Sequence, residues 1–158
     1  MMKMPNYHHI KNLRGRYRMT YQKILLAADG SNHSIRATKE VVKIISLNAN
    51  ATVTVVLVAD YSQAKSDVLH SGSSFELDMK RRKKLLPVEE LLKQENVNYR
   101  VEILHGLPGP TIVEFANKQN YDLLVIGSRG LNSLQEMMLG SVSHKVVKLA
   151  ECPVLIVK

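Results

Sequence analysis

The chain has 158 residues, a length that fits one domain, and 45% of them are apolar, enough for a sizeable core. No apolar run approaches the ~20 residues that a helix needs to span a bilayer, so no membrane-spanning segment is expected. The single cysteine, Cys152, has no partner for an internal disulfide, which suits a reducing compartment. We therefore expect a cytoplasmic protein.

The formal net charge of +8 is unevenly distributed along the chain. Residues 1–18 contain five basic and no acidic residues, whereas the remainder carries 17 basic and 14 acidic ones. We interpret residues 1–18 as a basic, disordered extension and residues 19–158 as the folded domain. The alternative is that the extension attracts nucleic acid or an anionic membrane.

The first predicted strand is the apolar run Lys23–Ala28. The turn residues Asp29-Gly30-Ser31 follow it, with Ser31 suited to cap a helix. Apolar residues at helical spacing predict a helix over Ser34–Leu47. The β-branched run Thr52–Ala59 predicts the second strand.

A second helix is predicted over Phe75–Gln94, with a kink or restart near Leu86 because Pro87 interrupts it. Gly106, Pro108, Gly109 and Pro110 are interpreted as a turn. The remaining expected elements are a strand at Asn98–Leu104, a helix at Thr111–Asn120, a strand at Asp122–Ile126, a helix at Gly140–Ala150 and a strand at Pro153–Val157.

The predicted elements alternate between strand and helix from end to end. Nearly continuous apolar strands separated by helices indicate a parallel sheet that is covered on both faces. Right-handed crossovers then build one doubly wound α/β domain with a five-stranded sheet.

The main functional signal is a glycine pattern after the fourth strand. Gly127, Gly130 and Gly140 remove side chains where the backbone can approach a ligand or adopt a positive φ. Ser141 follows at the start of a predicted helix, where unpaired N–H groups and the positive end of the dipole favour an anion. The pattern therefore predicts a phosphate site made by backbone groups. Plain turn glycines are the alternative.

The pattern G-x2-G-x9-G-S/T resembles the signature of the ATP-binding branch of the universal stress protein family. The resemblance extends from about Tyr21 to Lys158, and Ala27 and Ala28 depart from it where many members have proline and threonine. The flanking segments that resemble the family are Lys23–Ser31, Gly106-Leu107-Pro108, Asp122–Gly130, Leu139–Ser143 and Cys152–Val157.

The resemblance implies the strand order 3-2-1-4-5 and ATP bound in the crevice between strands 1 and 4. It implies that Asp29 holds ribose or a metal–phosphate group, and that Val58 meets adenine through its backbone. Mg²⁺ or Mn²⁺ would be bound through the phosphates, with no metal ligand assigned in the chain. The residues implied to surround the phosphates are Gly127, Arg129, Gly130, Gly140, Ser141, Val142 and Ser143.

Several of these residues have plainer interpretations. Asp29 can simply cap the first helix, and Arg129 can face solvent instead of pairing with phosphate. The basic run Lys80–Lys84 can grip an acidic partner or form a solvated helix face, and the absence of interleaved aromatic residues favours the solvated face. Cys152 is expected to be a buried, inert thiol.

The glycine pattern and the family resemblance together imply an ATP-binding stress-response switch with slow or no hydrolysis. The chain has no G-x4-G-K-S/T motif and no nucleophile–base pair evident in the sequence. An adenylyl-transfer or pyrophosphatase enzyme is the first alternative, although the S-G-G-x-D-S and H-x-G-H segments are missing. A nucleic-acid-binding module acting through residues 1–18 is the second.

A homodimer is predicted through the last strand, Pro153–Lys158. In the implied order this strand lies at the sheet edge, and its exposed backbone groups invite pairing with a second copy. The family resemblance also implies a dimer, because members commonly dimerise through this strand. The alternative is a monomer whose edge is shielded.

Overall fold

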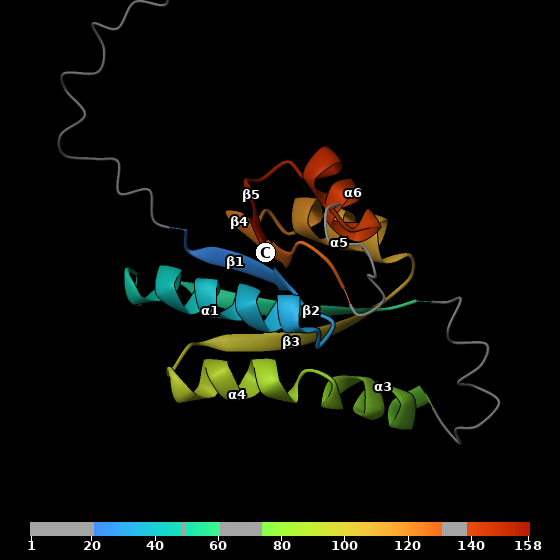
Figure 1. Ribbon diagram of the computed structural model, residues 1–158, viewed down its shortest axis with the longest axis horizontal. Coiled ribbons are helices and arrows are strands. Elements are labelled where there is room, and N and C mark those ends of the chain that lie inside the picture. The colour runs from blue at the N-terminus through green and yellow to red at the C-terminus, as the bar shows by residue number, and fades with distance from the viewer. Residues whose placement is uncertain (1–20, 49, 61–73, 131–138) are drawn as a thin grey trace, which may run out of the picture.

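The computed structural model describes residues 21–48, 50–60, 74–130 and 139–158. The predicted extension, residues 1–18, lies outside these described residues. In chain order, with the labels of Figure 1, the elements are β1 (Lys23–Ala27), α1 (Asn32–Ser46), β2 (Thr52–Ala59), α3 (Ser74–Lys83), α4 (Leu86–Gln94), β3 (Tyr99–His105), α5 (Pro108–Lys118), β4 (Leu123–Gly127), α6 (Ser141–Leu149) and β5 (Val154–Val157). None of the helices in this described part is long and apolar enough to cross a membrane.

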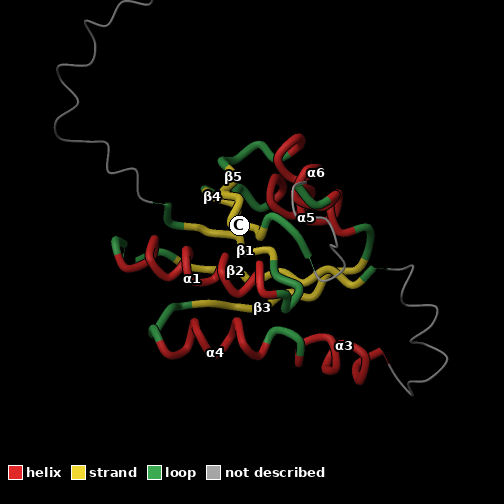
Figure 2. Tube along the Cα trace, viewed as in Figure 1, coloured by secondary structure: helices red, strands yellow, loops and turns green. Residues whose placement is uncertain are grey.

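The five strands form one parallel sheet in the order β3-β2-β1-β4-β5, which confirms the predicted order (Figure 2). The central strand β1 pairs on both sides, so that Leu25 lies opposite Thr54 of β2 and Leu124 of β4. The chain reverses its direction of winding between β1 and β4. A crevice at the carboxyl ends of these strands is the usual ligand position in such sheets.

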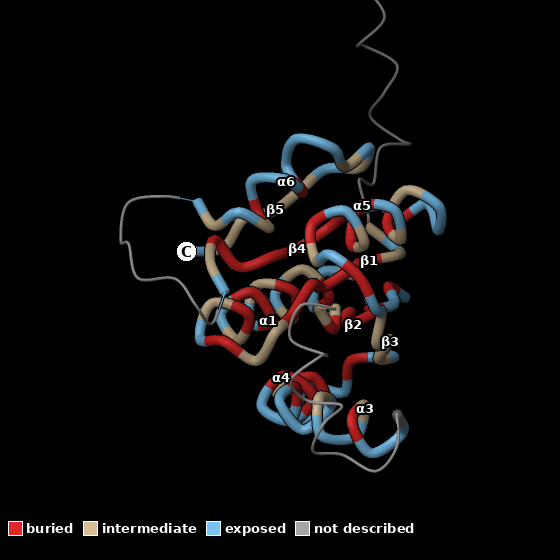
Figure 3. The backbone as a smooth tube through the Cα atoms, turned by 90° about the vertical axis from the view of Figure 1, so that its right-hand side faces the viewer, coloured by how far each residue is buried: buried red, intermediate tan, exposed pale blue. Residues whose placement is uncertain are grey.

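Helices cover both faces of the sheet, as the apolar strands predict (Figure 1). Ile24 and Leu26 of β1 lie in a core with Val41 of α1, whereas Leu25 lies in a second core with Ile112 of α5. Figure 3 shows buried backbone along the central strands β1 and β4. The rigid centre of the sheet therefore carries the strand ends that form the crevice.

The predicted interruption of the second helix is confirmed. Helix α3 ends at Lys83, and α4 begins at Leu86 with Pro87 in its first turn. A proline at this position costs little, because the first amides of a helix have no intrahelical acceptor. Leu85 lies between the two helices and is completely buried, so the break is anchored in the core.

The expected start of α5 at Thr111 is wrong, because the helix already begins at Pro108. Gly106 has a φ of +149° and makes the turn before it. Pro108 and Pro110 then occupy the first and third helical positions, where the missing N–H groups remove no helical hydrogen bond. The proline cluster therefore starts a helix instead of delaying it.

Strand boundaries differ from the expected ones by single residues. Asp122 was expected to open β4, but the strand begins at Leu123. The Asp122 carboxylate instead accepts hydrogen bonds from the backbone N–H groups of Gln22 and Lys23, at 3.0 and 2.8 Å. It thereby joins the beginnings of β1 and β4, which sets the relative position of the two strands.

Candidate functional site

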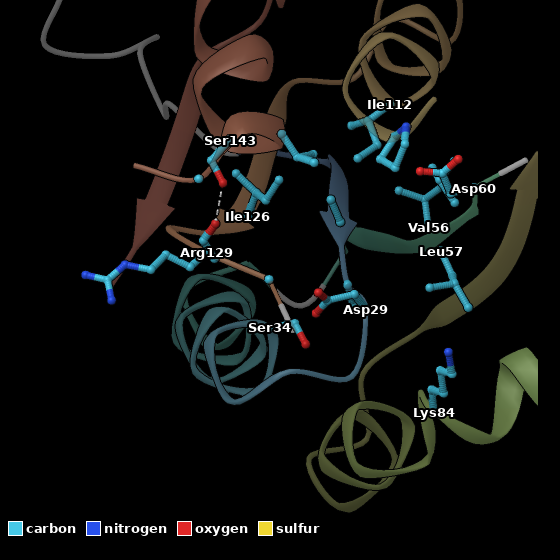
Figure 4. Close-up of a pocket in the computed structure, with 18 of the residues that line it drawn as sticks. Asp29, Ser34, Val56, Leu57, Asp60, Lys84, Ile112, Ile126, Arg129 and Ser143 are labelled. Carbon is cyan, nitrogen blue, oxygen red and sulfur yellow. Dashed lines mark hydrogen bonds between the residues drawn. The ribbon is translucent and has the colours of Figure 1, made fainter. Parts of the chain in front are cut away.

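The carboxyl ends of β1, β2 and β4 open into a cavity of about 560 Å³ (Figure 4). Helices α5 and α6 contribute walls from one face of the sheet, and α1 and the α3–α4 turn contribute walls from the other. Ligand pockets generally measure roughly 300–1,000 Å³. The cavity is therefore large enough for a nucleotide-sized ligand.

The structure brings all of the site residues expected from the sequence to this one cavity. They come from the ends of β1, β2 and β4, the loop after β4 and the first turn of α6. They are Asp29, Val58, Gly127, Arg129, Gly130, Gly140, Ser141, Val142 and Ser143.

The first turn of α6 offers backbone donors at the cavity wall. Gly140 is the N-cap residue, with an extended conformation and no side-chain cap. The N–H of Gly140 donates to the carbonyl of Ser128 at 2.8 Å, and the hydroxyl of Ser143 donates to the carbonyl of Gly127 at 2.8 Å. These bonds tie the helix start to the end of β4. The first N–H groups of a helix have no intrahelical acceptor, so this end of the cavity favours an anion.

Among the described glycines, a positive φ occurs only at Gly30 and Gly106. The three glycines of the motif are instead needed because neighbouring atoms lie too close for a Cβ. A Cβ on Gly130 would lie 2.6 Å from a carboxylate oxygen of Asp29. A Cβ on Gly140 would lie 3.2 Å from the carbonyl oxygen of Ser128. The loop after β4 thus lies directly over the acidic side chain at the end of β1.

Gly127 has a different packing reason from the other two. A Cβ there would lie 2.7 Å from Cβ and 2.8 Å from the carbonyl carbon of His33, in the first turn of α1. The absence of a side chain therefore lets α1 approach β4. Gly127 still lines the cavity, but helix packing is sufficient to explain why this position is glycine.

Asp29 does not cap α1. The cap is Ser31, as the sequence predicts, whose hydroxyl oxygen accepts from the N–H of Ser34 at 3.2 Å. The Asp29 carboxylate accepts instead from the N–H of Ser31 at 3.0 Å, and its other oxygen lies beside Gly130. This geometry orients one carboxylate oxygen within the turn and the other toward the loop of the glycine motif.

An apolar section of the cavity lies between the end of β2 and α5. Val56 and Val58 line it from β2, and Ile112 lines it from α5. Figure 4 shows Ile112 and Val56 on the side away from Lys84. Apolar walls combined with a few polar groups are typical of sites that bind a ring system and orient it.

The structure divides the basic run at the end of α3. Lys80, Arg82, Lys83 and Lys84 are exposed, as a solvated face would be, whereas Arg81 is half-buried. Arg81 and Lys84 line the cavity, which the interpretation as a solvated face missed. No local pattern marks these two residues, because their position depends on how the α3–α4 turn meets the sheet.

The side chain of Arg129 does not point into the cavity, as pairing with phosphate would require (Figure 4). Its residue lines the cavity, but Figure 4 shows its side chain extending away from Asp29 and the interior. The guanidinium contributes to the electrostatics of His33, together with Arg36. Burial first, and then these two cations, lower the pKa of His33, so the imidazole beside the glycine loop is held neutral.

Cys152 is half-buried, and burial raises the pKa of its thiol, which disfavours the reactive thiolate. Within residues 21–48, 50–60, 74–130 and 139–158, no group of three or more His, Cys, Asp or Glu side chains is placed to hold a metal ion.

Comparison with known proteins supports one family. The model of the universal stress protein family matches residues 20–158. Universal stress protein MJ0531 of Methanocaldococcus jannaschii is 36% identical over 143 residues, covering 87% of this chain and 82% of its own. Among solved structures, hypothetical protein MJ0577 of the same organism is 30% identical, with a TM-score of 0.76 over 88% of this chain and 96% of that one.

A more distant structure shares the fold. The universal stress protein of Archaeoglobus fulgidus, solved in complex with dAMP, is 22% identical, with a TM-score of 0.65 over 89% of this chain and 100% of that one. The family match spans nearly all of the described strands and helices. The chain belongs to the universal stress protein family.

Proposed function

We propose that this protein binds ATP in the cavity at the carboxyl end of the sheet and acts as a nucleotide-dependent stress-response switch. The observation that carries the proposal is that three groups suited to binding a nucleotide line one cavity. The Asp29 carboxylate, the Gly130 loop and the uncapped start of α6 line the same cavity, although they are far apart in the sequence.

In the proposed complex the phosphates lie against the first turn of α6 and the loop at Gly130. Their charge is stabilised by the helix dipole and by the free N–H groups of Ser141, Val142 and Ser143. The ribose lies beside Asp29, and the base occupies the apolar section at Val58. A relative solved in complex with dAMP shares this fold.

A divalent cation fits this arrangement only as a partner of the phosphates. The Asp29 carboxylate lies beside the Gly130 loop, and Mg²⁺ is commonly held by one or two carboxylates plus substrate phosphates. Mg²⁺ or Mn²⁺ would neutralise phosphate charge near Asp29. We propose that hydrolysis is slow or absent, because the sequence offers no nucleophile–base pair for it.

We further propose that residues 19–158 form the binding domain, that the protein works in the cytoplasm, and that it forms a homodimer through β5. The single cysteine, which has no partner for an internal disulfide, supports a reducing compartment. The position of β5 at the sheet edge supports the dimer.

The test of nucleotide binding uses two loop variants. Gly130→Val and Gly140→Val place a branched side chain against the Asp29 carboxylate and against the Ser128 carbonyl. This would displace the loop and the helix start that are proposed to hold the phosphates. We expect calorimetry with Mg²⁺ and ATP to show binding by the unmodified protein and none by either variant. Leu139→Ala, an exposed neighbour that is not part of the cavity wall, should bind normally.

Nucleotide released by denaturing the freshly purified protein should also be identified by chromatography. Unchanged ATP affinity in both loop variants, with the fold verified by circular dichroism, would contradict the proposed site. Rapid turnover of ATP would instead contradict the proposed switch and favour an enzyme.

A further inference from the structure

The cavity has a basic wall at the end remote from α6. Arg81 lines it from the last turn of α3 and Lys84 from the α3–α4 turn, on the other side of the sheet from Ser143. Figure 4 shows the Lys84 side chain extending toward Leu57 near the end of β2. Asp29, which follows β1, lines the same cavity, with one carboxylate oxygen turned toward the Gly130 loop. Two cationic residues, Arg81 and Lys84, therefore line the same cavity.

Arg81 is held in place by a chain of contacts to the sheet. Its guanidinium donates to Asp78 at 3.0 Å, and the side chain is only 14% exposed. The same carboxylate oxygen of Asp78 lies 3.3 Å from Nε2 of His105, the last residue of β3. A guanidinium has five N–H donors, so the bond to Asp78 leaves donors for a ligand.

Lys84 is positioned through its backbone. Its N–H donates to the carbonyl of Arg81 at 3.0 Å, and its own carbonyl lies directly against Gly30, which has a φ of +83°. A side chain at Gly30 would collide with this carbonyl. The close approach brings Cβ of Lys84 within 3.3 Å of the position that a Cβ on Gly30 would occupy.

The turn itself is fixed by a third contact. The Arg82 guanidinium donates to both carboxylate oxygens of Glu89, at 3.0 and 3.1 Å, and the hydroxyl of Tyr99 donates to Glu89 at 2.9 Å. Glu89 is buried, so this contact connects α3, α4 and β3 at one point. The cationic pair at the cavity is therefore presented by an anchored turn and not by a loose surface.

The charged side chains of lysine and arginine only donate hydrogen bonds and are positive at neutral pH, so a cavity wall that carries both favours an anionic group. We propose that Arg81 and Lys84 form a second anion-binding subsite, which lets the cavity take nucleotides that carry a phosphate on the ribose as well as on the 5′ oxygen. The inference rests on the proposed nucleotide site. With the 5′ phosphates at α6, one ribose hydroxyl donates to Asp29, and the phosphate on the other reaches the cations.

The test compares three ligands by calorimetry: AMP, adenosine 3′,5′-bisphosphate and its 2′,5′ isomer. In the unmodified protein, at least one bisphosphate should bind about tenfold tighter than AMP, the scale of one hydrogen bond to a charged group. Lys84→Ala should abolish this advantage while leaving AMP binding intact. Lys84→Glu should make both bisphosphates bind more weakly than AMP.

Lys83→Ala is the matched control, since it removes the same charge from an exposed neighbour that does not line the cavity. It should keep the bisphosphate advantage. ATP binding without any preference for a bisphosphate over AMP overturns this inference alone. The inference is also overturned if Lys84→Ala still binds a bisphosphate about tenfold tighter than AMP. If the unmodified protein binds no nucleotide, the proposed function fails first.

Discussion

At the scale of single residues, each of the three glycines of the motif makes room for a different neighbouring group. Gly127 makes room for α1, Gly130 for the carboxylate of Asp29, and Gly140 for the carbonyl of Ser128. A glycine pattern that looks like one ligand-binding signature is therefore partly a packing signature. The distinction can be tested by adding a single methyl group at a time.

Gly127→Ala should destabilise the fold. The new Cβ would lie 2.7 Å from Cβ of His33, and forcing a methyl group into a close-packed site typically costs about 1–3 kcal/mol. Urea unfolding measures the loss. Gly140→Ala is the control, because its nearest contact is 3.2 Å and the cost there should be smaller. Equal stability of Gly127→Ala and the unmodified protein would contradict this account of Gly127.

Asp29→Ala should weaken ATP binding by about 1–3 kcal/mol, the scale of a hydrogen bond that involves a charged group. The reason is that Asp29 faces the cavity, while Ser31 caps α1. Ser31→Ala should do the reverse, lowering the free energy of unfolding by about 1 kcal/mol through the lost cap, with little change in affinity. Calorimetry and urea unfolding on both variants separate the two roles. Unchanged affinity in Asp29→Ala would refute its role as a ligand contact.

At the scale of elements, the decisive junction is the α3–α4 turn. Leu85 is buried in the core and Glu89 connects Arg82 to Tyr99, so the turn is fixed by an apolar and a polar contact together. The hydrogen bond from Arg82 is the largest influence on Glu89 and lowers the pKa of its carboxyl. Burial, the largest influence on Tyr99, raises the pKa of its phenol to about 12.

These two pKa shifts predict stability limits on opposite sides of neutral pH. Below the ordinary pKa of a glutamate, the unfolded chain binds a proton that folded Glu89 resists, so stability falls as the pH drops toward the lowered value. Between pH 10.0 and about 12 the unfolded tyrosine ionises first, so stability falls as the pH rises. Urea unfolding across pH measures both slopes.

Glu89→Gln should flatten the acid slope and cost about 1–3 kcal/mol at neutral pH, because Arg82 loses a charged acceptor. Tyr99→Phe should flatten the alkaline slope and reduce the acid slope only in part, because the hydrogen bond from Tyr99 lowers the pKa of Glu89 less than the bond from Arg82 does. An acid slope that is unchanged in Glu89→Gln would show that other carboxyl groups control acid stability.

The order of elements was predictable because each buried strand is a short apolar run bounded by turn residues. Asp29 and the glycine motif were predictable for a similar reason, since strand ends in such a sheet meet at one edge. The early start of α5 was missed because prolines such as Pro108 interrupt helices and also begin them. Arg81 and Lys84 were missed because their position depends on a tertiary contact at Gly30, which leaves no periodic signal.

At the scale of the whole molecule, β5 occupies one edge of the sheet and pairs with β4 in the described structure. Its side chains are half-buried, with Leu155 packing against one core and Ile156 against the other. Its outer backbone groups are therefore in position to pair with a second copy in a two-fold interface.

We expect the protein to be a dimer at tens of micromolar, as measured by light scattering. Ile156→Pro should shift it toward the monomer, because proline removes a ladder donor. Val147→Ala on α6 is a control away from the strand, and it should remain dimeric. A monomeric unmodified protein at this concentration would contradict the interface.

The contact of Gly30 with the Lys84 carbonyl has a consequence for motion. The loop after β1 and the turn after α3 touch through backbone atoms, so neither can open without disturbing the other. The N–H groups of Lys84 and Leu85 are bonded to carbonyls within that turn. A ligand that immobilises Asp29 should therefore slow hydrogen–deuterium exchange at these two amides, although neither belongs to the glycine motif. Exchange at the β2–β3 ladder should stay unchanged, which would make the turn a remote reporter of occupancy.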